Sequence, residues 1–79
     1  MDTNKAVRIS GIEFANASEA LQHVEAGGRG VAVLVGGRHL VVEQAEADRM
    51  AAAGVHFAYL VDHELPDGTR RVMTVPVND

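Results

Sequence analysis

The sequence predicts an α+β domain of the ferredoxin-like class: a βαββαβ sandwich with an extra C-terminal edge strand and two helices on one face of an antiparallel sheet. Two observations predict it. Residues 14–35 and 41–61 repeat one order of strand, helix, Ala-Gly ending and β-branched strand. A two-glycine turn joins the repeats, and residues 69–77 supply the further strand.

The first strand is predicted over residues 5–9, where apolar and polar side chains alternate as in a half-buried strand. Gly11 permits a kink before the apolar residues 12–14. Right-handed crossovers between parallel strands then predict the strand order 5-4-1-3-2, which places this first strand inside the sheet.

Two helices are predicted from their end signals. Asn16 followed three residues later by Glu19 fits a capping box and begins a helix over about residues 17–26. The alanine-rich residues 43–54 form the second helix, which ends at Gly54 in a Schellman motif.

Two hairpins are predicted from turn chemistry. Gly36 and Gly37 separate two β-branched runs, which favours a primed two-residue turn, and residues 65–69, LPDGT, fit a type I turn followed by a bulge. Pro76 lacks a backbone N–H, so the last strand should lie at an edge. The predicted pairs are Val35–Arg38, Val33–Leu40 and Val31–Val42 in one hairpin, and Glu64–Arg70, His63–Arg71, Val61–Met73, Tyr59–Val75 and Phe57–Val77 in the other.

The glycine-rich residues 25–38 raise the question of a phosphate-binding loop. Such loops follow a strand and precede a helix, so that free N–H groups face the anion. Gly27, Gly28 and Gly30 instead follow a helix, whose carbonyl end repels an anion. These glycines are therefore interpreted as helix endings and turns.

Composition limits the function classes. The 79 residues predict a single domain, 1–79, and the absence of cysteine together with a polar N-terminus predicts a cytoplasmic protein with no membrane partner. A net charge of -4 and scattered arginines argue against nucleic acid as a partner.

Chemical motifs are lacking in the sequence. No Ser or Thr stands in the context of an activated nucleophile, and the four histidines have no metal-ligand spacing. Asp62 and Glu64 point to the strand face opposite His63, which prevents the three from holding one ion. The sequence therefore predicts no enzyme activity, no cofactor and no metal.

The remaining feature is the sheet face opposite the helices. On the assigned register Val35, Phe57, Tyr59 and Val61 belong to the core, and the opposite face carries a connected apolar patch with polar residues around it. The predicted interaction face consists of Arg8, Leu34, His39, Val41, His56, Leu60, Asp62 and Val72.

This face predicts a small non-enzymatic interaction or regulatory module that forms a homodimer or binds another protein. An inhibitor of the kind encoded by phages or mobile elements is one variety. Imperfect alternation in half-buried strands is the structural alternative to a binding face. The functional alternative is a small-ligand or metal-binding enzyme subunit, with a pocket between two dimerised faces lined by Arg8, His39, His56 and Asp62.

Overall fold

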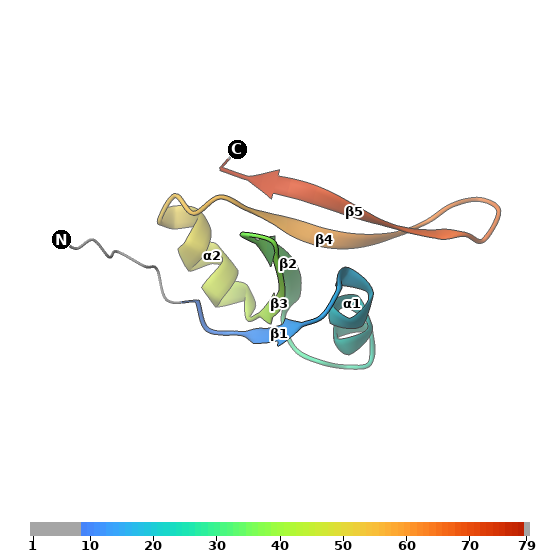
Figure 1. Cartoon of the computed structure of the whole chain (residues 1–79), viewed down its shortest axis with the longest axis horizontal. Coiled ribbons are helices and arrows are strands. Elements are labelled where there is room, and N and C mark those ends of the chain that lie inside the picture. Colours follow the sequence, from blue (N-terminus) through green and yellow to red (C-terminus); the bar gives the residue numbers. More distant parts are fainter. Residues whose placement is uncertain (1–8, 79) are drawn as a thin grey trace.

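The chain folds as an α+β domain of two helices and one five-stranded antiparallel sheet, in a computed structural model that describes residues 9–78 (Figure 1). Its elements in chain order are β1 (Ile12–Phe14), α1 (Ala17–Glu25), β2 (Val31–Val35), β3 (Arg38–Val42), α2 (Gln44–Ala52), β4 (Phe57–Glu64) and β5 (Arg70–Val77). The predicted strand at 5–9 lies outside the described residues except for Ile9, which packs against the core without belonging to a strand.

Both predicted helices are confirmed, and their end signals act as expected. The Asn16 side chain accepts a hydrogen bond from the Glu19 backbone N–H at 2.9 Å, which satisfies one of the free donors of the first turn. At the end of α2, the Val55 N–H donates to the Met50 carbonyl at 3.0 Å while Gly54 takes a φ of 80°. This is the predicted Schellman ending.

Both hairpins form with every predicted residue pair. Gly36 and Gly37 have φ values of 56° and 81°, as a type I′ turn requires. In the second turn the Gly68 N–H donates to the Leu65 carbonyl, and the Leu65 N–H donates to the Thr69 carbonyl at 2.7 Å. Beyond β5, the Asn78 side-chain amide donates to the carbonyl of Ala51 in α2 and to that of Val55 after the helix, which anchors the end of the strand there.

The strand order is β1-β3-β2-β4-β5, which differs from the predicted order 5-4-1-3-2. The strand β1 forms one edge beside β3, and β4 pairs with β2 through Val33–Tyr59 and Leu34–Ala58. The position of β5 at the other edge is confirmed. The sheet is antiparallel and open, but the predicted ferredoxin-like strand order is not the one observed.

The two helices lie on opposite faces of the sheet, and the prediction of both on one face is wrong. In this order, the connection from β1 to β2 and the connection from β3 to β4 cross the sheet in the same direction. The strands from which they start, β1 and β3, run antiparallel. Crossovers between parallel strands are right-handed as a rule. When two such crossovers start from antiparallel strands and move in the same direction, their helices lie on opposite faces of the sheet. Each face of the central strands is therefore covered (Figure 1).

Two apolar layers result. Residues of β2, β3 and β4 alternate between them, which is why these strands read as continuous apolar runs. The layer under α2 contains Val33, Leu40, Val42, Ala47, Met50 and Phe57. The layer under α1 contains Ala20, Ala32, Val41 and Leu60, with Phe14, Ala17, Leu21, Val24 and Leu34 packed against it.

The β4–β5 hairpin extends well beyond the other strands and forms a protruding ribbon (Figure 1). Among the residues predicted to form the core, Phe57 is buried and Val35 and Tyr59 pack against the α2 layer. Val61 is 43% exposed, so its assignment to the core is wrong. It lies along β4 past the residues that α2 covers.

Candidate functional site

The predicted interaction face is not open, because α1 covers its centre. Val41 is 4% exposed and Leu60 is 7% exposed, and Leu34 is half-buried against the same layer. These side chains pack against Leu21 and its neighbours on α1 rather than facing solvent. The apolar residues of this face therefore hold the helix onto the sheet.

The polar members of the predicted face are distributed over separate places. His39 is half-buried on β3 opposite Phe14, and His56 is exposed in the segment before β4. Asp62 and Val72 are paired on the protruding ribbon, and Arg8 lies outside the described residues. Within residues 9–78 no group of three His, Asp or Glu side chains is placed to hold a metal ion.

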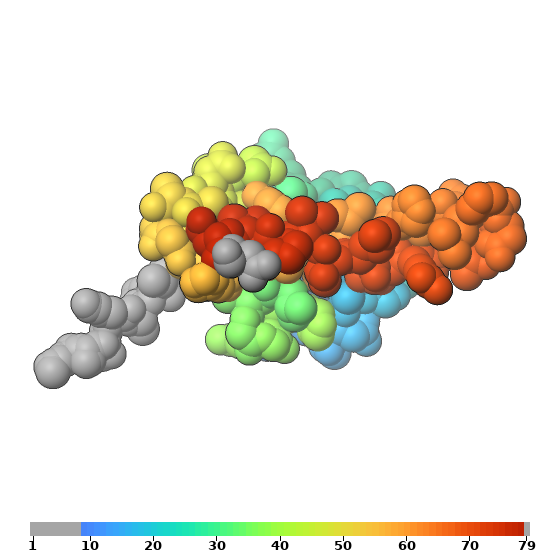
Figure 2. All heavy atoms as spheres, turned by 90° about the horizontal axis from the view of Figure 1, so that it is seen from above, coloured from blue at the N-terminus to red at the C-terminus, as the bar shows by residue number. Residues whose placement is uncertain are grey.

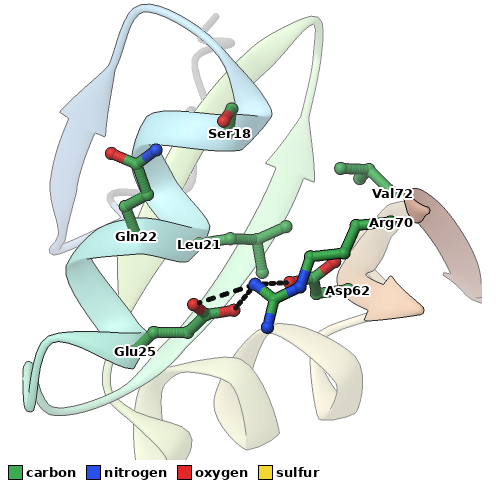
Figure 3. Close-up of a pocket in the computed structure, with 7 residues that line it drawn as sticks. All are labelled: Ser18, Leu21, Gln22, Glu25, Asp62, Arg70 and Val72. Carbon is green, nitrogen blue, oxygen red and sulfur yellow. Dashed lines mark hydrogen bonds and ion pairs between the residues drawn. The ribbon is translucent and has the colours of Figure 1, made fainter. Parts of the chain in front are cut away.

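A cleft of about 240 Å³ lies between α1 and the ribbon (Figure 3). Its walls combine apolar and polar groups from both elements. The lining residues are Ser18, Leu21, Gln22 and Glu25 of α1, Asp62 of β4, and Arg70 and Val72 of β5.

Arg70 forms the main polar link across this cleft. Its guanidinium points between two carboxylates, at 3.0 Å from an Asp62 oxygen and 3.4 Å from a Glu25 oxygen (Figure 3). The negative charge of Asp62, and to a smaller extent that of Glu25, raises the pKa of the Arg70 guanidinium. The sequence places Arg70 opposite Glu64, but the side chain turns instead toward these two partners. An ion-paired side chain therefore bridges the cleft.

The ribbon carries an exposed apolar row on its other face. Val61, Met73 and Val75 are 43%, 50% and 50% exposed, respectively. Val61 pairs with Met73, and Val75 pairs with Tyr59, so the three lie on the face of the sheet that carries α2. We call these three residues the apolar row.

The apolar row is exposed because α2 does not cover it: Val61 and Met73 lie along the strands past the residues that α2 contacts, and Val75 lies on the edge strand. That helix has nine residues, and its buried Ala47 and Met50 contact the layer that ends with Phe57 and Tyr59. The alternation of β4 and β5 identified the face on which the row lies. The sequence contains no signal for where the covering helix stops along the strand.

The open edge of β5 borders the same row. Among the described residues β5 has β4 as its one strand neighbour, and every residue from Arg70 to Pro76 is exposed. Figure 2 looks toward this edge and shows β5, in red, running along the surface and onto the protruding ribbon. A long edge strand with apolar side chains is a template for pairing with another chain.

Comparison of the chain with protein-family models, curated proteins and solved structures finds no match. Neither helix of the described part of the chain has the length and apolarity needed to cross a membrane.

Proposed function

We propose that the protein is a small non-enzymatic interaction module that binds another protein chain through the β4–β5 ribbon. The observation that supports this proposal is the apolar row beside an open edge strand. The row places three large apolar side chains, each at least 43% exposed, on the β4–β5 hairpin, two of them on the edge strand β5. Association through such a surface combines apolar burial with backbone pairing.

The local charges suit such a surface. Arg70 is ion-paired on the α1 face, whereas the apolar row occupies the α2 face. Arg71 lies on the same face as the row, opposite His63, and no carboxylate interrupts Val61, Met73 and Val75. An apolar centre beside a charged end is the arrangement found in protein interfaces.

A photo-crosslinking residue tests this proposal in the cells that produce the protein. Benzoylphenylalanine at Met73 should form adducts with a protein chain, whereas the same residue at Ile12 should not. Ile12 is the matched control because it is also apolar and 52% exposed, but lies on β1 at the opposite edge of the sheet. Absence of an adduct at position 73, or equal adducts at both positions, would contradict the proposal.

The small-ligand alternative would use the cleft between α1 and the ribbon. The one cation among its lining residues, Arg70, is already held by Asp62 and Glu25, and a volume of about 240 Å³ is below the usual range for such pockets. A ligand would have to displace that ion pair. The interaction proposal needs no rearrangement of the fold.

A further inference from the structure

The backbone of β5 has a defined pattern of inward and outward groups. The Leu65 N–H donates to the Thr69 carbonyl, so this is a hydrogen-bonded pair of the β4–β5 ladder. Such pairs alternate with non-bonded pairs along antiparallel strands. With the observed register, Met73 and Val75 bond to β4, whereas Val72 and Thr74 direct their N–H and carbonyl groups to the open edge.

Pro76 belongs to the outward set, because it lies two residues after Thr74. Its missing N–H therefore removes no hydrogen bond from the β4–β5 ladder. Arg70 also belongs to this set. The open edge thus presents three donors, from Arg70, Val72 and Thr74, and four carbonyls, the fourth from Pro76.

We propose that a second copy of this chain pairs with β5 in antiparallel orientation, with the two-fold axis passing between the two Met73 residues. In this register the Val72 and Thr74 residues of the two copies exchange backbone hydrogen bonds. The Arg70 N–H of each copy donates to the Pro76 carbonyl of the other. Every outward donor of one copy then meets an outward carbonyl of the other, so the edge is complementary to itself.

The side chains favour the same register. The two Met73 side chains lie directly opposite each other on the α2 face, in a non-hydrogen-bonded pair, where side chains approach most closely. Each Val75 lies diagonally beside Met73 of the other copy. The two apolar rows thus join into one apolar strip that runs from Val61 of one copy to Val61 of the other.

Charge and proline disfavour the neighbouring registers. A shift by two residues in one direction places Pro76 opposite Val72, where its ring meets a carbonyl in the middle of the new ladder. A shift the other way places Arg71 opposite Met73 and brings the arginines of the two copies closer together. With Met73 on the axis, four residues separate the two Arg71 positions along the strand, about 14 Å. That distance exceeds the screening length of about 10 Å at 0.1 M salt.

This inference rests on the proposed use of the ribbon and adds the identity of the partner. The experiment is light scattering over a concentration series with the variants Met73→Lys and Met73→Glu, alone and mixed. The wild-type chain should approach twice its mass of 8.4 kDa. Each variant alone should dimerise at least tenfold more weakly, because like charges then lie opposite each other.

The equimolar mixture should restore association as a heterodimer, since Lys and Glu meet across the two-fold axis. Ile12→Lys is the matched control and should dimerise as the wild type does. A second variant, Thr74→Pro, removes one outward donor without removing a bond to β4, and should also weaken the dimer. Equal melting temperatures, measured in protein dilute enough that the wild type is monomeric, would show that the variants remain folded.

Two results would overturn the inference. A wild-type chain that stays monomeric at every concentration would exclude the second copy, and a dimer insensitive to Met73→Lys would place the contact elsewhere. The proposed function is tested separately: if the chain is monomeric but position 73 still crosslinks to a different protein, the ribbon is an interaction surface with another partner. If position 73 crosslinks to nothing, both proposals fail.

Discussion

Neighbouring residues on β4 should respond very differently to truncation, because they lie on opposite faces of the sheet. Leu60 is 7% exposed beneath α1, whereas Val61 is 43% exposed on the ribbon. The perturbation is Leu60→Ala compared with Val61→Ala. The adjacent positions share their strand, and Leu→Ala removes one side-chain carbon more than Val→Ala, so a large difference between the two variants reports burial.

The expected magnitudes follow from that burial. Truncating a buried leucine to alanine lowers the free energy of unfolding by about 2–5 kcal/mol, because transfer and cavity terms add. Leu60 packs among Ala20, Ala32 and Val41, so the smaller side chain leaves a gap between α1 and the sheet. Val61→Ala should lower the free energy of unfolding by at most about 1 kcal/mol, since much of the Val61 side chain is already exposed to water.

These values are large relative to the whole domain. At roughly 0.05–0.15 kcal/mol per residue, a chain of this length has a free energy of unfolding of about 4–12 kcal/mol. Leu60→Asp should therefore prevent folding, because a carboxylate at this position would be buried without a partner. Val61→Asp should leave a folded protein whose association is lost.

Urea unfolding followed by circular dichroism measures both alanine variants, at a protein concentration low enough that association does not contribute to stability. Equal losses for Leu60→Ala and Val61→Ala would refute the assignment of α1 to the face that carries Leu60. A folded, stable Leu60→Asp protein would show that this face is open, as the sequence alone predicts.

The remaining predictions concern the turns, the helix cap and the cleft. Asn16→Ala should lower the free energy of unfolding by about 1 kcal/mol in urea titrations, whereas Asn16→Asp should retain the cap. The pKa of the Asp67 carboxyl is lowered because the Thr69 N–H donates to it at 2.9 Å, so the stability it contributes is present at neutral pH and lost as the pH falls through its folded pKa. Asp67→Asn should abolish that acid-side loss, as measured by urea titrations at several pH values. Divalent metals, nucleotides and carboxylates should leave the melting temperature of the monomer unchanged; a shift that Arg70→Ala removes would favour the small-ligand alternative.

Local structure could be predicted from the sequence because its signals are local. The Asn16 cap, the Gly54 helix ending, the Gly36-Gly37 turn and the LPDGT turn each act within a few residues. Together they identified both helices and all the predicted pairs of both hairpins. The edge position of β5 followed from Pro76 alone.

The arrangement of these units could not be predicted from the same signals. The choice between β1 and β2 as the neighbour of β4 depends on long-range packing, and it decides the face on which α2 lies. The apolar residues Leu34, Val41 and Leu60 carried the necessary information, since strands with two apolar faces indicate two covering layers. Interpreting that second face as open led to a surface whose apolar centre α1 covers.

The exposed ribbon was missed for a related reason. Val61 continues the alternation of Phe57 and Tyr59, so the pattern assigns all three to the core. Val61 differs from the other two residues in being exposed, because β4 continues past the part of the strand that α2 covers. A period-2 pattern identifies a face but not how far along a strand that face is covered.

The central claim is that a second copy of the chain covers the open edge of β5, and amide hydrogen exchange measured by NMR tests it most directly. Met73 and Val75 donate to β4 and should be protected at every concentration. Val72 and Thr74 face the open edge, so their amides should exchange rapidly in the dilute protein and become protected as concentration rises. Rapid exchange of Val72 and Thr74 at every concentration would contradict the claim that a second copy pairs along this edge.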